Sequence, residues 1–159
     1  MGTYALRPVD DSFLDEAKIV IRSTVDLAAT PAQVWEALGS DEMWSWLPVI
    51  DRVEWLTERP HVEGCVRRLR LGKFLTVDEE FYRWEVEKRA TFRVTAQNRN
   101  VLDGLIEDFV LEPSDKGTRL TWTMALTPRR GKSLPLGFLA PLLAPGNTVA
   151  IGGIKKIIR

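Results

Sequence analysis

Six segments between residues 49 and 127 alternate apolar and polar side chains with a period of two, and only short turns separate them. This alternation is typical of half-buried β-strands, and strands joined by short connections favour an antiparallel meander with one apolar face. Such a face must be buried against another element, which restricts the folds open to the chain. The predicted strands are Val49–Leu56, Gly64–Leu71, Phe74–Trp84, Lys88–Gln97, Gly104–Glu112 and Thr118–Thr127.

The residues before this meander predict one more strand and two short helices. Alternation over Ile19–Leu27 indicates a strand. Thr30 followed by Pro31 is a typical helix start, and Gly39 marks the end of that helix. A second short helix, which contains Trp44, is expected before the meander begins.

The final stretch, Leu134–Arg159, is mostly apolar and is expected to end in a helix that runs to Ile158. No other predicted element is long enough to cover the sheet. The predicted fold is therefore α+β, with a curved antiparallel sheet of seven strands around a C-terminal helix. A sheet that grips a helix can leave a space between them, and small ligands commonly occupy such spaces. Residues 1–18 are expected to form a flexible N-terminal arm and residues 19–159 a single domain.

Composition excludes several classes of function. The chain has 22 basic and 22 acidic residues, so it lacks the basic excess of a general nucleic-acid binder. A single cysteine, Cys65, excludes an intramolecular disulfide, and a single histidine, His61, excludes the common two-histidine metal motifs. We therefore expect no metal and no cofactor. The N-terminus has no long apolar run, which fits a cytoplasmic protein.

The order of the predicted elements resembles that of the helix-grip superfamily. This superfamily includes START lipid-transfer domains, plant pollen-allergen and hormone-receptor proteins, and bacterial polyketide cyclase/dehydrase-like proteins. The resemblance covers residues 19–127 well and residues 128–159 poorly. It implies a START-like domain with a cavity for a hydrophobic or amphipathic molecule, and it carries over no catalytic motif. The matching stretches are Val25–Trp35, Trp46–Ile50, Gly64–Arg67, Glu80 within the following strand, and Gly117–Trp122.

Strand parity selects the polar side chains that enter the predicted cavity. If Leu69 and Leu71 face inward, Arg67 faces inward with them. The family resemblance places Glu80 and Tyr82 on the inner face of the next strand, where Glu80 would pair with Arg67. The functional interpretation is a polar anchor in an apolar pocket, and the alternative is an ion pair at the rim.

Glu107 is the second candidate, because it faces inward if Leu105 and Phe109 do. A carboxyl group among apolar residues has a raised pKa and can act as an acid or a base. The opposite register would place Asp108 there instead. Glu107 and Glu80 are thus the candidate catalytic residues.

The remaining predicted ligand-binding residues form an apolar and aromatic wall, which suits a flat or polycyclic ligand. His61 lies in a predicted hairpin and is expected to be solvated. Cys65 has no base near it in sequence, so nucleophilic catalysis has little support. The wall residues are Leu69, Leu71, Tyr82, Phe92, Trp122 and Met124.

The segment from Ser133 to Ile154 contains no charged residue. Its prolines and glycines interrupt any single membrane-spanning helix, and a short apolar turn or helix is expected over Leu136–Leu143. The segment can cover a wide cavity, pack against a second subunit in a homodimer, or touch a membrane surface. The leading function is binding of a small hydrophobic ligand, such as a lipid, a polyketide or another polycyclic molecule. The alternatives are a polyketide cyclase/dehydratase-type enzyme and a membrane-associated lipid shuttle.

Overall fold

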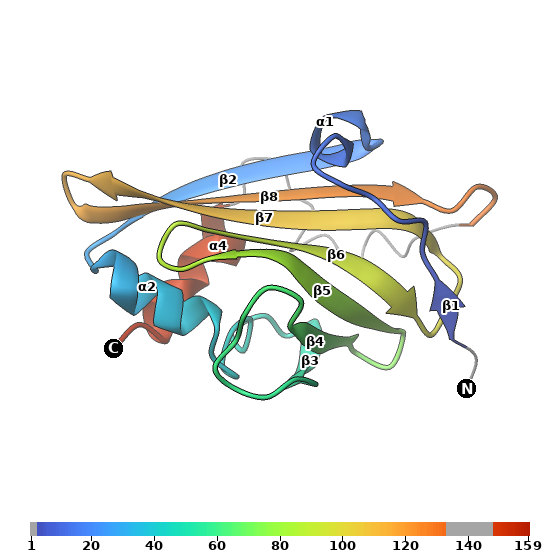
Figure 1. The fold of residues 1–159 in the computed structure, drawn as a ribbon, viewed down its shortest axis with the longest axis horizontal. Helices are drawn as coiled ribbons and strands as arrows, with labels where there is room; N and C mark the ends of the chain where they lie inside the picture. Colours follow the sequence, from blue (N-terminus) through green and yellow to red (C-terminus); the bar gives the residue numbers. More distant parts are fainter. Residues whose placement is uncertain (1–2, 133–147) are drawn as a thin grey trace.

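A curved antiparallel sheet dominates the computed structural model, which describes residues 3–132 and 148–159 (Figure 1). Seven strands lie in the spatial order β2-β8-β7-β6-β5-β4-β3, and a short strand β1 (Tyr4–Ala5) pairs with β6. The predicted curved antiparallel sheet of seven strands is confirmed, and β1 was not predicted. The seven strands are β2 (Ile19–Leu27), β3 (Ile50–Trp55), β4 (Val66–Leu71), β5 (Leu75–Glu85), β6 (Arg89–Gln97), β7 (Leu102–Ser114) and β8 (Gly117–Pro128).

The first predicted short helix is present as α2 (Pro31–Leu38). The Thr30 hydroxyl accepts a hydrogen bond from the Gln33 backbone N–H, and the Gln33 side chain accepts one from the Thr30 N–H. This capping box fixes the start of the helix. The second predicted helix is wrong in detail. Residues 41–46 form consecutive turns, and Trp44 has a φ of 70°, which is incompatible with a right-handed helix.

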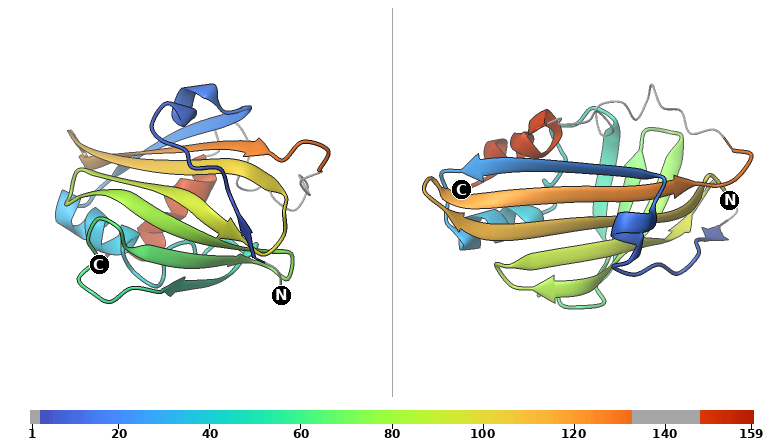
Figure 2. Two further views of the ribbon diagram at one scale, coloured as in Figure 1. Left: turned by 45° about the vertical axis from the view of Figure 1, so that its right-hand side comes forward. Right: turned by 90° about the horizontal axis from the view of Figure 1, so that it is seen from above.

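The C-terminal helix is short. It consists of α4 (Thr148–Gly152) followed directly by the 3-10 helix η1 (Gly153–Lys156), and α4 packs against β2. Ile151 and Ile154 are fully buried in the main core. Figure 2 shows α4 and α1 on opposite faces of the sheet. The turn or helix expected over Leu136–Leu143 lies outside the described residues.

The N-terminal arm crosses the face of the sheet that is opposite α4, which we call the outer face (Figures 1 and 2). Its short helix α1 (Phe13–Glu16) buries Phe13 in a small cluster with Val9, Ile106 and Ala125. The sequence predicts a flexible arm over residues 1–18, with order beginning near Ile19. Residues from Thr3 onward are instead docked in the structure, because Val9 and Phe13 bury apolar surface there.

The inner face of the sheet carries the main hydrophobic core. Alternate residues of each strand point to this face, and α2, the turns at 41–46 and the C-terminal helix pack against it. Several rings gather there, with the Trp44 ring centroid 5.2 Å from that of Trp122 and 6.2 Å from that of Phe109. The core is thus rich in aromatic side chains.

Candidate functional site

Three ionisable side chains are buried together among the apolar residues of the inner face. They are Arg67 on β4, Glu79 on β5 and Glu107 on β7, which are 1%, 2% and 9% exposed. Arg67 Nε donates a hydrogen bond of 2.6 Å to Glu79 Oε2. Trp122 Nε1 donates one of 2.8 Å to Glu107 Oε2. We call Arg67, Glu79, Glu107 and Trp122 the inner polar cluster.

Aromatic rings surround the guanidinium group of Arg67. Its Cζ atom lies 5.1 Å from the centroid of Phe81, 5.4 Å from that of Phe92 and 5.5 Å from that of Trp55. These distances allow cation–π attraction, which is strongest where water is excluded. Among the described residues, Arg67 Nη2 has no hydrogen-bond partner. The guanidinium group therefore keeps one buried donor for another partner.

The two carboxyl groups of the inner polar cluster compete for one positive charge. Burial raises the pKa of Glu107 to about 8, and the negative charge of Glu79 acts in the same direction. Burial also raises the pKa of Glu79, although the charge and the hydrogen bond of Arg67 oppose this. Because Glu79 holds the guanidinium group directly, we assign Glu79 as the ionised carboxylate and Glu107 as a protonated acid at neutral pH. Glu107 can then donate a proton or a hydrogen bond.

Most of the predicted site residues do lie on the inner face. Glu107 is there and Asp108 is not, so the first of the two registers considered for β7 is correct. Asp108 is buried on the outer face, where it accepts hydrogen bonds from Arg89 Nε and Thr91 Oγ1. The predicted residues that are buried on the inner face are Arg67, Leu69, Leu71, Phe92, Glu107, Trp122 and Met124.

The predictions for Glu80 and Tyr82 were wrong. Glu80 lies on the outer face and pairs with Arg93 at 2.8 Å, so it is neither the partner of Arg67 nor an internal acid. Tyr82 also points outward, and its hydroxyl donates a 2.7 Å hydrogen bond to Asp11 in the N-terminal arm. Arg67 pairs instead with Glu79, which was not among the predicted site residues.

A bulge in β5 explains this error. Phe81 pairs with Phe92 and Arg83 pairs with Thr91, so Tyr82 is an extra residue in the strand. Trp84 faces inward beyond the bulge, where its ring packs against Trp35. The family resemblance placed Tyr82 and Glu80 on the inner face in phase with Trp84, whereas the bulge reverses the parity between Phe81 and Trp84. The sequence signal for Glu79 was its position two residues from both Val77 and Phe81, which are apolar and point to the same face of the strand.

His61 was expected to be solvated, but its side chain is only partly exposed and both of its ring nitrogens are buried. Its ring stacks on Trp55 with the centroids 3.7 Å apart and meets Trp84 edge-on at 5.8 Å. Burial and the nearby positive charge of Arg59 lower the pKa of the imidazole, so the ring is neutral at pH 7. Cys65 is buried as well, and burial raises the pKa of its thiol to about 11, which removes it as a nucleophile.

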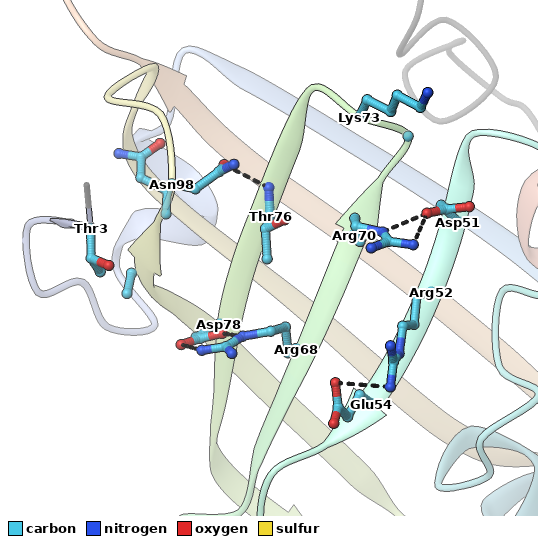
Figure 3. A pocket seen from close by; sticks show the side chains of 13 residues that line it. Thr3, Asp51, Arg52, Glu54, Arg68, Arg70, Lys73, Thr76, Asp78 and Asn98 are labelled. Carbon is cyan, nitrogen blue, oxygen red and sulfur yellow. Dashed lines mark hydrogen bonds and ion pairs between the residues drawn. The ribbon is translucent and has the colours of Figure 1, made fainter. Parts of the chain in front are cut away.

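A separate surface pocket of about 690 Å³ lies on the outer face of β3, β4 and β5 (Figure 3). Its charged side chains pair with each other: Arg68 with Asp78, and Arg70 with Asp51. Lys73 projects at one end of this pocket in Figure 3. Arg68 and Arg70 alternate with Arg67 along β4, so the pocket and the inner polar cluster lie on opposite faces of the sheet.

The sequence matches one known protein family over residues 18–159, and that family is described as polyketide cyclase / dehydrase and lipid transport. The match spans most of the chain and includes every residue of the inner polar cluster. The chain belongs to this family. A relative in Mycobacterium tuberculosis (strain H37Rv), described as an uncharacterized protein, is 36% identical over 123 residues, which is 77% of this chain and 74% of the relative.

Solved structures of several other proteins have a similar fold. A START superfamily protein from Mycobacterium smegmatis superimposes with a TM-score of 0.66 at 13% identity, over 87% of this chain and 96% of its own. The Zhui aromatase/cyclase from Streptomyces sp. R1128 gives a TM-score of 0.62 at 20% identity, over 88% and 95% of the two chains. These similarities establish the START-like, helix-grip fold. No helix within residues 3–132 and 148–159 is long and apolar enough to cross a membrane.

The raised pKa of Glu107 makes the stability of this family member depend on pH. Because the carboxyl group has a folded-state pKa of about 8, the folded state binds more protons than the unfolded state between pH 4.5 and 8. Stability should therefore fall as pH rises through this window, by at most ~1.4 kcal/mol per pH unit. Replacing Glu107 by glutamine keeps an acceptor for Trp122 Nε1 and removes the titration.

Chemical denaturation of both proteins at a series of pH values measures this effect. We expect Glu107→Gln to match the wild type at pH 5 and to be more stable at pH 9. Asp108→Asn is the matched control, because it changes the neighbouring acid on the outer face. A difference between wild type and Glu107→Gln that is the same at both pH values would show that Glu107 ionises normally.

Proposed function

We propose that this protein binds a small hydrophobic ligand, such as a lipid, a polyketide or another polycyclic molecule, in an internal cavity between the inner face of the sheet and the C-terminal helix. The observation that carries the proposal is the inner polar cluster. Burying an arginine and two carboxyl groups in an aromatic core costs several kcal/mol and is a poor means of gaining stability. The burial of these residues is explained if they form a polar anchor that orients an otherwise apolar ligand.

The comparisons support the same interpretation at a coarser level. The family description includes lipid transport, and the structural relatives include a START superfamily protein and an aromatase/cyclase. All three suggest a small, largely apolar molecule as ligand. Phe92, Trp122 and Met124 flank the ionisable groups on the inner face, so a ligand held by these groups would contact aromatic and apolar side chains.

Native mass spectrometry of the full chain, purified from its own host, tests the proposal. We expect a bound molecule whose mass is found again after organic extraction. Glu107→Gln should lower its occupancy, because the variant loses the acidic proton of the anchor. Asp108→Asn, on the opposite face of the same strand, should leave the occupancy unchanged. A wild-type protein that is ligand-free in its own host would contradict the proposal.

The raised pKa of Glu107 also supports a second candidate function, which is catalysis of the polyketide cyclase/dehydratase type. A protonated carboxyl group with a pKa of about 8 is an acid matched to neutral pH. It can protonate the carbonyl oxygen of a poly-β-ketone while an enol carbon attacks, and loss of water from the resulting aldol completes the closure. Incubation with a linear poly-β-ketone thioester, followed by chromatography and mass spectrometry, should reveal a product lighter by one water. Unchanged turnover in Glu107→Gln would remove this residue as the acid.

The lipid-shuttle, membrane-contact and homodimer predictions depend on the uncharged segment 133–154, of which residues 133–147 lie outside the described part of the chain. They stay predictions. Flotation of the full chain with anionic liposomes at low salt measures membrane contact, and sedimentation measures the oligomeric state. Failure to float would argue against the lipid shuttle and leave ligand binding untouched.

A further inference from the structure

Buried nitrogen atoms without hydrogen-bond partners gather at one end of the inner face. Among the described residues, six buried polar side-chain atoms lack a partner, and four of them belong to Trp55, His61 and Arg67. They are Trp55 Nε1, both ring nitrogens of His61, and Arg67 Nη2. Buried polar groups in folded proteins are nearly always paired, so such a concentration requires an explanation.

The three side chains are neighbours in the structure. Trp55 and Arg67 occupy paired positions on β3 and β4 and lie on the same face of the sheet. The guanidinium Cζ is 5.5 Å from the Trp55 ring, and the His61 ring is stacked on the indole at 3.7 Å. Arg67 is also 1% exposed, so its free donor is aimed into the protein interior. We call Trp55, His61 and Arg67 the donor triad.

The donor triad is suited to bind a hydrogen-bond acceptor atom. Trp55 Nε1 and Arg67 Nη2 carry hydrogens and cannot accept, and a neutral His61 has one donor and one acceptor nitrogen. The Gly39 carbonyl lies close enough to His61 to favour its protonation without completing a hydrogen bond. At least two N–H groups thus remain for an oxygen atom of a bound molecule.

The charges around the donor triad decide which oxygen fits. Arg67 is neutralised by Glu79, Glu107 is protonated at neutral pH, and the other charges that act on His61 are Arg59 and Asp41, which form an ion pair at 2.9 Å. The formal charge of the surroundings is therefore zero. A carboxylate would add an uncompensated buried charge, whereas a carbonyl or hydroxyl oxygen would satisfy the donors without that cost.

We propose that the donor triad is the polar subsite of the ligand site and that it receives an uncharged carbonyl or hydroxyl oxygen carried on a flat ring system. This inference rests on the proposed ligand-binding function and names the ligand class more narrowly. The rings of the ligand pack against the aromatic side chains near Arg67, and the oxygen accepts hydrogen bonds from Trp55 Nε1 and Arg67 Nη2.

Three compounds that share the tetralin ring system test the subsite. 1-Tetralone carries a ring carbonyl, tetralin lacks the oxygen, and 5,6,7,8-tetrahydro-1-naphthoate carries a carboxylate. The readout is the set of indole N–H signals of the ¹⁵N-labelled full chain at pH 6.5, with calorimetry for affinity. We expect 1-tetralone to bind about tenfold more tightly than tetralin, which is what one good hydrogen bond supplies. It should also shift the Trp55 indole signal downfield.

Matched variants distinguish the effect of the Trp55 indole N–H from the effect of its aromatic ring. Trp55→Phe keeps an aromatic ring and removes the donor, so it should reduce the preference for 1-tetralone over tetralin. Trp84→Phe makes the same change in a ring 6.1 Å away and should leave the preference intact. Nuclear Overhauser assignment of the wild-type indole signals keeps the test decisive if Trp55→Phe fails to fold.

Each outcome has a distinct meaning. Equal affinity for 1-tetralone and tetralin, with the Trp55 signal unmoved, overturns the subsite and leaves the proposed ligand-binding function standing. Tighter binding of the carboxylate overturns the uncharged class. If none of the three compounds binds at millimolar concentration, the subsite is overturned, and a ligand found by mass spectrometry would still support the general function.

Discussion

Replacing Arg67 by methionine should lower the free energy of unfolding by about 3–5 kcal/mol at pH 7. The substitution leaves the Glu79 carboxylate buried without the cation that holds it at 2.6 Å. It also removes the guanidinium group from the rings of Phe81 and Phe92. Glu79 must then take up a proton in the folded state, so the loss should shrink as the pH is lowered. Urea denaturation at pH 5 and pH 7 measures both effects.

Arg68→Met is the matched control on the same strand. Arg68 pairs with Asp78 through two hydrogen bonds, but its side chain is 47% exposed, so its loss should cost at most ~1 kcal/mol. A double change of Arg67 and Glu79 to methionine should recover much of the stability, because no buried charge remains. Equal costs for Arg67→Met and Arg68→Met would show that the inner polar cluster is not a buried ion pair.

The sequence predicts the sheet well because a local rule governs it. Period-two alternation selects one face of each strand, and β4 follows it without interruption. Arg67 could therefore be placed inside from its neighbours Leu69 and Leu71, whereas the apolar residues around Glu107 left open the opposite register, with Asp108 inside. Each residue is an exception in an otherwise apolar row, which is the kind of signal that marks a functional group.

The partners of these two residues could not be predicted in the same way. The choice of Glu79 over Glu80 depends on the bulge at Tyr82, and a bulge changes the parity of every residue beyond it. The hydrogen bond from Trp122 to Glu107 depends on the pairing of β7 with β8, where Glu107 stands opposite Met124 and diagonal to Trp122. Both depend on how neighbouring strands pair, and within β5 the phase of Val77 and Phe81 was the signal that pointed to Glu79.

The ends of the chain were the hardest to predict. The acidic residues of the N-terminal arm suggested a solvated segment, but Asp11 accepts hydrogen bonds from both Tyr82 and Arg83 and so anchors the arm to the outer face. Likewise, His61 lies in a polar loop whose sequence suggests exposure, whereas stacking on Trp55 buries both ring nitrogens. In each case a long-range contact overrides local composition.

Replacing Gly153 by alanine should have the second large effect on stability. A Cβ atom at this position would lie 2.1 Å from the ring of Trp46, much closer than a van der Waals contact allows. Trp46 cannot withdraw freely, because its Nε1 donates a 2.7 Å hydrogen bond to the Ala150 carbonyl. The short C-terminal helix must therefore shift, and overpacking of this kind costs about 1–3 kcal/mol. Thermal denaturation and Trp fluorescence of the full chain measure the loss.

The adjacent glycine is a control that differs only in its surroundings. A Cβ atom at Gly152 would meet no atom within 4 Å, and its backbone is helical, with φ −61° and ψ −23°. Gly152→Ala should therefore raise stability by about 0.5–1 kcal/mol, because alanine loses less backbone entropy in a helix. Opposite signs for two neighbouring substitutions cannot come from helix propensity alone. They would show that contact with Trp46 sets the position of the C-terminal helix over the inner face, and equal effects would contradict that packing.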